Sequence, residues 1–329
     1  MELVCPAGNY QSLIKAVDGG ADAVYLGLKN ETNARHFAGL NFTGKQIGKA
    51  LDYAHQRHCK VYCAINTYPR THQWGRWTNS VDQALDLGID SIIVADIGVM
   101  DYIRSRSNDY PIHLSVQASA TNLQAVNFYH QNFGIHRAVL PRVLSLSQVA
   151  KLAKTAPCEI EVFGFGSLCI MAEGRCYLSS YMTGESPNTK GVCSPASYVD
   201  WQEKDGQLES RLNNILIDRF AEYENAGYPT VCKGRFEING QVAHALEEPT
   251  SLNTMDILSD LYAAGVVAIK IEGRQRSPAY VNQVTRAWRK AIDKVVQFGE
   301  KVTQQEIDGL AVLAEGKQTT IGAYERNWQ

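Results

Sequence analysis

The sequence has neither a long hydrophobic run nor an excess of charge of one sign. No uncharged apolar segment approaches the roughly 20 residues that a membrane-spanning helix needs. The first ten residues, MELVCPAGNY, do not form the basic and apolar regions of a signal peptide. We therefore expect a cytoplasmic protein without a transmembrane segment.

Charge is balanced over the 329 residues. Thirty-two lysines and arginines face 34 aspartates and glutamates, which gives a formal charge of −2. A total this small gives no sign of a broad nucleic-acid-binding surface, although a local basic patch is compatible with it.

Motifs of hydrolases and of nucleotide-binding enzymes are also missing. The sequence contains no GxSxG elbow, no HExxH helix and no convincing arrangement of cysteine, histidine and asparagine. No GxGxxG follows a predicted strand, and the glycine-rich Phe163–Ser167 has no phosphate-binding lysine. Peptidase activity and Rossmann-type binding of nicotinamide or flavin therefore have no support.

Short β-rich runs alternate with segments of helical periodicity. Strands are predicted at residues 3–5, 23–26, 61–65, 91–95, 113–116, 138–140, 161–165 and 266–271. Helical spacing appears between them, for example over residues 11–17, 46–56 and 123–131, and Asn9 is placed to cap the first helix. Eight such units predict an α/β fold, a (β/α)8 TIM-type barrel. A doubly wound open sheet is the alternative.

We expect one barrel-like domain over residues 1–329, interrupted by a long insertion after the seventh strand. The insertion is predicted at residues 170–245, and it includes a hairpin-like pattern at residues 235–242. A connection of this length inside a compact fold usually has a function.

Four of the eight cysteines lie in polar, glycine-rich segments at or after the end of the seventh strand. They are Cys169, Cys176, Cys193 and Cys232, separated by six, sixteen and thirty-eight residues, with no CxxC pair. Structural zinc sites typically use closely paired cysteines, whereas an iron–sulfur cluster takes thiolates from separate segments. The spacing favours a cluster, but four reduced structural cysteines remain the alternative. Cys59, Cys63 and Cys158 are interpreted as structural, and Cys5 stays open.

The surroundings of these four cysteines suit a cluster. Glycines would let the backbone approach an inorganic core, serine hydroxyls could donate to its sulfurs, and cationic side chains would favour thiolates. The residues concerned are Gly164, Gly166, Gly174, Gly191, Gly234, Ser167, Ser179, Ser194, Arg175, Lys190, Lys233 and Arg235.

Polar side chains follow the predicted strands at the end where barrel enzymes place their chemistry. These side chains predict a binding site for a polar or anionic small molecule; they are Glu31, Asn33, Arg35, His36, Asn66, Asp96, Gln117, Ser119, Arg142, Glu272 and Arg274. Arg35 and His36 are the strongest candidates for binding a carboxylate. Asp96 and Arg142 could instead cap a helix or pair with a neighbour, and Glu272 and Arg274 could form a salt bridge.

Several longer segments resemble the collagenase-like peptidase family called U-thirty-two. They are residues 5–8 (CPAG), 21–27 (ADAVYLG), 33–42 (NARHFAGLNF), 115–119 (SVQAS) and 161–181 (EVFGFGSLCIMAEGRCYLSSY). The resemblance covers essentially the full chain. Residues 185–196 (ESPNTKGVCSPA), 225–235 (NAGYPTVCKGR), 245–253 (ALEEPTSLN) and 270–281 (KIEGRQRSPAYV) narrow it to the branch that acts in anaerobic ubiquinone biosynthesis.

This resemblance implies a 4Fe-4S cluster held by Cys169, Cys176, Cys193 and Cys232. It implies a heterodimer with a UbiV-like subunit, a UbiT-like lipid carrier as a further partner, and oxygen-independent hydroxylation of a ubiquinone precursor. Prephenate is the implied hydroxyl donor, and Arg35, His36, Arg142 and Arg274 are our candidates for binding its carboxylates.

Other readings stay open beside this one. Members of the family that hydroxylate RNA tend to be longer, and with the charge of −2 this disfavours an RNA substrate, so no nucleic acid partner is expected. Hydroxylation of tRNA or rRNA is nevertheless the first alternative. A non-catalytic cluster-bearing assembly protein is the second, and a structural zinc protein is the third.

Overall fold

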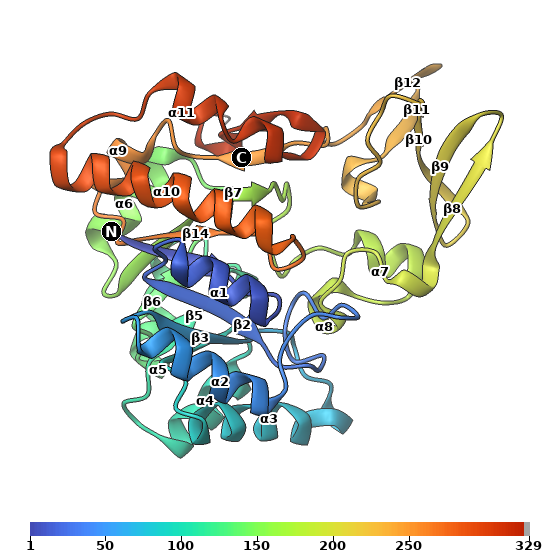
Figure 1. The fold of residues 1–329 in the computed structure, drawn as a ribbon. Coiled ribbons are helices and arrows are strands. Elements are labelled where there is room, and N and C mark those ends of the chain that lie inside the picture. The colour runs from blue at the N-terminus through green and yellow to red at the C-terminus, as the bar shows by residue number, and fades with distance from the viewer. Residues whose placement is uncertain (326–329) are drawn as a thin grey trace.

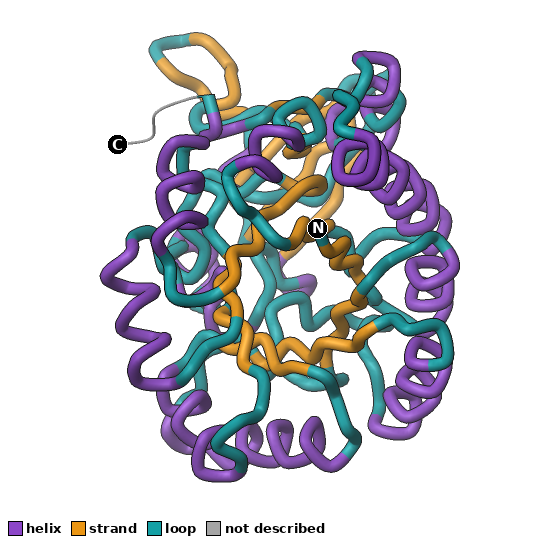
Figure 2. Tube along the Cα trace, turned by 90° about the vertical axis from the view of Figure 1, so that its left-hand side faces the viewer, coloured by secondary structure: helices purple, strands orange, loops and turns teal. Residues whose placement is uncertain are grey.

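The computed structural model describes residues 1–325, and eight parallel strands form a closed barrel at its centre. The last strand pairs with the first and with the seventh, which closes the ring that is seen end-on in Figure 2. The strands are β1 (Glu2–Pro6), β2 (Ala23–Gly27), β3 (Lys60–Ile65), β4 (Ser91–Val94), β5 (Ile112–Leu114), β6 (Arg137–Val139), β7 (Glu159–Ser167) and β14 (Ala268–Ile271). The predicted TIM-type barrel is confirmed, and the open sheet is excluded.

Helices surround the barrel as an outer layer (Figures 1 and 2). They are α1 (Tyr10–Asp18), α2 (Gly44–His55), α3 (Trp74–Asp86), α4 (Ile97–Arg106), α5 (Leu123–Phe133), α6 (Leu146–Thr155), α9 (Leu258–Ala263) and α10 (Pro278–Phe298). Asn9 caps α1 by accepting from the Ser12 N–H, and Asp96 caps α4 by accepting from the Val99 N–H. No helix within residues 1–325 is both long and apolar enough to cross a bilayer.

The longest helix, α10, packs its apolar stripe against the barrel. Val281, Val284, Trp288 and Ile292 are buried in the main core, where α10 lies against α1 and β1. Because these residues recur at helical spacing, one face of the helix removes several large side chains from water.

A separate group of elements lies between β7 and β14, at the right of Figure 1. It contains α7 (Leu178–Thr183), α8 (Pro187–Lys190), the antiparallel strands β8 (Val199–Lys204), β9 (Gln207–Leu212) and β10 (Ile215–Phe220), and the hairpin of β11 (Arg235–Ile238) and β12 (Gln241–His244). Beyond it, β13 (Ser251–Asn253) runs antiparallel to β7, and β15 (Thr319–Thr320) pairs with β13. The short helix α11 (Gln304–Asp308) follows α10.

Inside the barrel, charged side chains form a buried network at the amino ends of the strands. Arg137 donates to Glu2 at 2.8 Å and to Glu161 at 3.1 Å, and Lys270 donates to Glu161 at 2.7 Å. Burial acts to raise the pKa of Glu161, but the charges of Lys270 and Arg137 lower it below its ordinary value. This network ties β1, β6, β7 and β14 together beneath the cavity described next.

Candidate functional site

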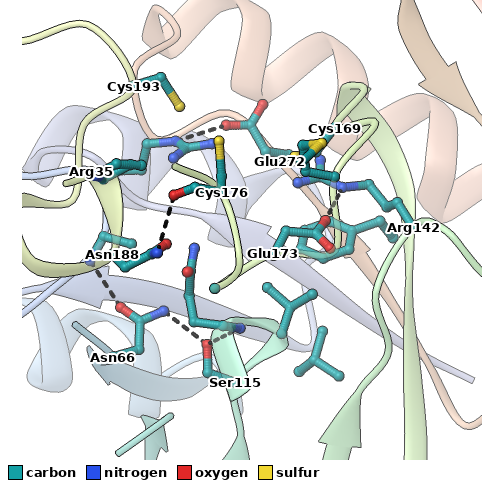
Figure 3. Close-up of a pocket in the computed structure, with 18 of the residues that line it drawn as sticks. Arg35, Asn66, Ser115, Arg142, Cys169, Glu173, Cys176, Asn188, Cys193 and Glu272 are labelled. Carbon is teal, nitrogen blue, oxygen red and sulfur yellow. Dashed lines mark hydrogen bonds and ion pairs between the residues drawn. The ribbon is translucent and has the colours of Figure 1, made fainter. Parts of the chain in front are cut away.

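All four loop cysteines line a single cavity of about 140 Å³ at the carboxyl ends of the barrel strands. Figure 3 labels three of them, Cys169, Cys176 and Cys193. Cys169 follows β7, Cys176 directly precedes Tyr177 at the start of α7, Cys193 follows α8, and Cys232 lies in a turn before β11. All four are free thiols. The fold thus brings together side chains that are up to 63 positions apart in the sequence.

Burial raises the pKa of three of these thiols, those of Cys169, Cys176 and Cys232. It raises the pKa of Cys169 to about 12, and Glu173 and Cys193 add to this shift while Arg142 opposes it. Burial also raises the pKa of Cys176 and of Cys232, and Cys193 contributes to both shifts. Cys193 is therefore an electrostatic neighbour of the other three thiols. A metal centre bound here would have to displace their protons.

Within residues 1–325, no three histidine, cysteine, aspartate or glutamate side chains gather tightly enough to hold a metal ion. Neither the structural zinc alternative nor the cluster gains support from this finding. A 4Fe-4S cluster distributes its four thiolates over four iron atoms and so needs a wider set. The cluster stays a prediction that rests on the shared cavity and the donor chemistry.

Hydrogen bonds connect the segments that carry the cysteines. The Ser179 hydroxyl donates to the Cys193 carbonyl, and Asn188 donates to the Cys176 carbonyl at 3.2 Å. The Ser194 hydroxyl donates to the Pro229 carbonyl. The prediction that Ser179 and Ser194 donate to cluster sulfurs is therefore wrong, because both hydroxyls bind backbone oxygens instead.

The glycines near the cysteines serve close backbone contacts. A Cβ atom at Gly174 would overlap the Gln117 carbonyl, and Gly174 has a φ of 87°. A Cβ atom at Gly191 would lie 2.6 Å from the Asn33 carbonyl oxygen, and the Gly191 carbonyl accepts from the Arg35 N–H at 2.7 Å. These two glycines let the insertion pack onto the barrel loops, which is a different role from the one predicted.

The predicted cationic neighbours of the cysteines are mostly paired elsewhere. Lys233 forms an ion pair with Glu315, and Arg235 pairs with Asp218 and Glu224. Arg175 donates to the Ser119 carbonyl at 3.3 Å. These cationic residues are neighbours of the cysteines in the sequence, but their side chains contact carboxylates and carbonyls elsewhere in the chain.

Three of the four predicted substrate-binding residues line the cavity, and the fourth does not. Arg35, Arg142 and Arg274 are lining residues, whereas His36 is not among them. Burial lowers the pKa of His36, and its Nδ1 atom is buried without a hydrogen-bond partner. The sequence alone could not show whether His36 points into the cavity as its neighbour Arg35 does, because the loop after β2 has no regular periodicity.

The three arginines differ in how their charge is compensated. Arg142 Nε lies 2.6 Å from Glu173 Oε1, and both side chains are buried. Arg35 Nε lies 3.5 Å from Glu272 Oε1. The predicted pair of Glu272 with Arg274 does not form; Glu272 pairs with Arg35 instead.

Arg274 is held by two amides. Its guanidinium donates to the side-chain oxygens of Asn33 at 3.0 Å and of Asn41 at 3.2 Å, and its Nε atom has no partner among the described residues. Arg274 is 4% exposed, and burial lowers its pKa to about 10. No carboxylate within residues 1–325 forms an ion pair with it. A buried cation in this state attracts an anion from outside the chain.

The structure adds lining residues that the sequence did not indicate. Glu173 and Asn188 come from the irregular insertion, while Tyr25 and Lys270 come from the barrel wall, with Lys270 Nζ 4.2 Å from the Tyr25 ring centroid. Asn66 was predicted, and it links Ala34 N–H and Ser115 through its side chain. Cys5 lies outside the site, since Thr285 of α10 donates to its sulfur.

Comparison with known proteins gives both a family and named relatives. The sequence profile of Peptidase family U32 matches residues 8–325. A "tRNA hydroxylation protein P" of Helicobacter pylori (strain ATCC 700392 / 26695) is 33% identical over 294 residues, covering 89% of this chain and 64% of that protein. A "23S rRNA 5-hydroxycytidine C2501 synthase" of Escherichia coli (strain K12) is 28% identical, covering 90% and 40%.

A third relative carries a different name. A "Collagenase" of Porphyromonas gingivalis (strain ATCC BAA-308 / W83) is 28% identical over 305 residues, covering 89% of this chain and 65% of that protein. This chain therefore spans somewhat less than two thirds of the Helicobacter and Porphyromonas proteins and less than half of the Escherichia coli rRNA synthase.

These names overturn the expected substrate. We predicted a UbiU-like subunit that hydroxylates a ubiquinone precursor, and this prediction is wrong: the relatives are named for hydroxylation of tRNA and rRNA. The relatives named for RNA hydroxylation are indeed longer, since this chain covers 64% of the Helicobacter protein and 40% of the Escherichia coli rRNA synthase, but this greater length did not argue against RNA, because the shared part covers 89–90% of this chain. The charge of −2 described the whole molecule and could not report on the face that carries the cavity.

Proposed function

Since this chain belongs to peptidase family U32, we propose that it takes part in oxygen-independent hydroxylation of a base in tRNA or rRNA, using a 4Fe-4S cluster. The observation that carries the proposal is the convergence of four distant free thiols on one cavity at the catalytic end of a TIM-type barrel. The names of the relatives supply the reaction class.

The cluster would be held by Cys169, Cys176, Cys193 and Cys232. When bound, such a group supplies redox chemistry tuned by burial and hydrogen bonds. The chain's own part is to bring the four loops together, through the hydrogen bonds of Ser179 and Asn188, and to keep the thiols buried beside Arg142.

A peptidase of the thiol type finds no support in this cavity. None of the described residues that line it is a histidine, so no lining cysteine has an imidazole base within the site. Burial raises the pKa values of Cys169, Cys176 and Cys232, which is the reverse of an activated nucleophile.

A small carboxylic acid is the hydroxyl donor in this proposal. Prephenate, predicted from the family resemblance, carries two carboxylates, and Arg274 offers a buried guanidinium that forms no ion pair with a carboxylate of the described residues. Arg35 lines the same cavity and its pairing with Glu272 at 3.5 Å is loose, so it is the second candidate partner. Arg142 is already committed to Glu173.

The rim of the cavity suits single-stranded RNA. Tyr177 is 70% exposed and Tyr181 is 91% exposed, and both lie on or next to α7, whose Leu178 and Ser179 line the cavity. Single-stranded bases stack on exposed aromatic rings of this kind.

Cations accompany these rings. The Tyr68 N–H donates to the Asn188 carbonyl at 3.0 Å, which places the loop of Arg70 beside α8 and its Lys190. Neither Arg70 nor Lys190 forms an ion pair with another described residue. They are available for phosphates, and this local patch is what the net charge concealed.

The predicted UbiV-like and UbiT-like partners and the heterodimer stay predictions from the resemblance. Their original context was the ubiquinone substrate, so the lipid carrier has no role in the reaction proposed now. A second family subunit remains compatible with it.

The test compares RNA from cells that carry the gene, lack it, or express variants. Digested tRNA and rRNA are analysed for hydroxylated nucleosides by mass spectrometry after growth without oxygen. We expect one hydroxylated nucleoside to vanish on deletion, to stay absent with Cys176→Ser, and to return with Cys158→Ser, whose thiol lies outside the cavity. An unchanged nucleoside profile in the deletion strain rejects the proposal.

A further inference from the structure

A second cavity of about 450 Å³ adjoins the cysteine cavity on the side of the insertion. The two cavities share four lining residues: Arg35, Cys193, Thr230 and Glu272. A molecule bound in the second cavity would therefore lie against the loop that carries Cys193, with Arg35 and Glu272 between it and the other thiols.

The walls of the second cavity combine aromatic and aliphatic surface. Phe37 and Tyr228 meet edge to face with ring centroids 5.9 Å apart, and both line it together with Phe220 and Ile217. The Tyr228 hydroxyl donates to the Ser194 carbonyl at 2.9 Å, which fixes this ring next to the residue that follows Cys193. Such walls suit a flat, weakly polar ring system.

Polar groups without partners face the same space. Ser210 lines the cavity, is fully buried, and its hydroxyl has no hydrogen-bond partner in the part of the chain that the structure describes. Leaving a buried hydroxyl unpaired destabilises the fold, so a ligand that forms a hydrogen bond to it would be favoured.

The rim of the second cavity carries positive charge. Lys317 is exposed and forms no ion pair with another described residue, and Arg276 shares the single carboxylate of Glu315 with Lys233. Two cations at the mouth of an aromatic pocket with a buried hydroxyl match a nucleotide, with its phosphate outside and its base inside.

We propose that this second cavity receives a single nucleotide of the RNA substrate, turned out of its stack, with the base beside the Cys193 loop. The inference rests on the proposed function for the identity of the polymer. Enzymes that modify a base take it out of the stack and hold it between aromatic or apolar side chains, with hydrogen bonds to its edge.

Size supports this division of the two cavities. Ligand pockets for small molecules typically measure about 300–1,000 Å³. The second cavity, at about 450 Å³, lies in this range, whereas the cysteine cavity, at about 140 Å³, lies below it. The four thiols and a nucleotide therefore do not share the smaller space.

The first test maps contact without requiring turnover. An RNA hairpin with 5-iodouridine in its loop is irradiated with the oxygen-protected protein, and crosslinked peptides are identified by mass spectrometry. We expect crosslinks to Phe37 or Tyr228. Crosslinks that map only to Tyr177 or Tyr181 place the base on the outer rim, and they overturn the proposal, as does a complete absence of crosslinks.

The second test fills the cavity. Ala226 is exposed and lines its mouth, so Ala226→Trp adds bulk there without disturbing the core. Ala243→Trp, at an exposed position of β12 that does not line the cavity, is the matched control. We expect Ala226→Trp to lower hydroxylation on the order of 10- to 100-fold with iron content unchanged, because a displaced base loses its reactive geometry. The control keeps the wild-type rate.

The outcomes separate the two proposals. If the wild-type protein crosslinks at Phe37 or Tyr228 but hydroxylates no RNA, the nucleotide site stands and the proposed reaction fails. If it hydroxylates RNA and Ala226→Trp is as active as Ala243→Trp, the reaction stands and the nucleotide site is elsewhere. If Ala226→Trp raises the KM for prephenate and leaves the KM for RNA unchanged, the cavity belongs to the acid and the proposal is rejected.

Discussion

At the scale of single residues, the arginines of the cavity show how burial and pairing separate structural from ligand-binding roles. Arg142 and Glu173 neutralise each other at 2.6 Å, whereas Arg274 is buried with amide oxygens as its hydrogen-bond partners and with the Tyr25 ring centroid 5.8 Å from its guanidinium carbon. Both arginines follow strands in the sequence and looked equivalent there. The difference lies in which loop residue reaches each guanidinium.

This contrast predicts opposite effects on stability for the same substitution. Arg142→Gln leaves Glu173 buried without its partner and should lower the free energy of unfolding by about 3–5 kcal/mol. Arg274→Gln removes a buried charge that has no ion-pair partner among the described residues, so the free energy of unfolding should be unchanged or higher. Urea unfolding of the two variants provides the measurement. Equal losses would show that the charge of Arg274 is compensated within the fold.

Arg274→Gln should also weaken binding of the acid. We expect the KM for prephenate to rise on the order of 10- to 100-fold, because a charged hydrogen bond to a carboxylate contributes about 1.5–3 kcal/mol. The KM for RNA should not change. Initial-rate kinetics with each substrate varied in turn separate the two values, and an unchanged KM for prephenate would remove Arg274 from the acid site.

At the scale of elements, the insertion depends on a few close contacts with the barrel loops. Gly174 adopts a φ of 87° where a side chain would strike the Gln117 carbonyl. Gly184 has a similar φ of 74° with nothing within 4 Å of an added Cβ atom. The two positions therefore distinguish backbone strain from loss of packing.

Gly174→Ala should displace the segment between Cys169 and Cys176 and reduce iron bound per chain by more than half, while Gly184→Ala should bind as much iron as the wild type. Both substitutions impose a comparable strain of about 1–2 kcal/mol on the backbone, but only the first one forces two chain segments apart. The measurement is the iron bound per chain in each variant, isolated without oxygen. Equal iron in both variants would contradict the role assigned to this contact.

The charged network inside the barrel predicts a pH dependence of stability. Burial acts to raise the pKa of Glu2, but Arg137 and then Tyr62 outweigh it, and the pKa falls from 4.5 to about 2. A depressed carboxyl pKa contributes stability that is present above the unfolded pKa and lost as pH falls toward the folded value. Glu2 therefore contributes roughly 3 kcal/mol to the free energy of unfolding. This contribution is lost as the pH falls from 4.5 to about 2.

Glu2→Gln should remove this dependence. Chemical unfolding of wild type and variant at several pH values across that window should give curves that converge as the pH falls. If the free energies of unfolding of wild type and variant ran parallel with pH, the pKa of Glu2 would be the same in the folded and unfolded chains.

At the scale of the whole molecule, the barrel could be predicted because its strands are short runs that are mostly buried and mostly apolar, and parallel strands buried on both faces read in this way. Asn9 and the stripe of α10 were equally readable, since capping and helical spacing are local. The strands β8 to β10 were not predicted. In β8 most side chains are exposed, so no apolar pattern marks it.

The site was predictable only in part, for reasons that are physical. Cysteine is chemically distinctive, so four loop cysteines stood out before their convergence on one cavity was known. Ser179, Lys233 and Arg235 were misassigned because sequence adjacency does not fix where a long or polar side chain points. The sequence did not favour the proposed RNA substrate because the total charge averages over faces, and the contact of Tyr68 with Asn188, which joins the segments of Arg70 and Lys190, is not visible in the sequence.

The local cations predict the salt dependence of RNA binding. For single-stranded RNA, each phosphate contact contributes about 0.7 to the slope of log K against log salt. Replacing Arg70 and Lys190 by alanine should reduce that slope by roughly 1–1.5. The matched control replaces Lys151 and Lys154 of α6, which are exposed on the outer helical layer. A control that changes the slope as much would indicate diffuse attraction and no defined patch.

The claim on which the account depends is that Cys169, Cys176, Cys193 and Cys232 hold one iron–sulfur centre. The direct measurement is the iron and acid-labile sulfide content of protein isolated without oxygen, together with its visible absorption. We predict about four iron and four sulfide per chain, with a broad band near roughly 400 nm that reductant bleaches. Colourless protein that contains zinc, or no metal, would contradict the account.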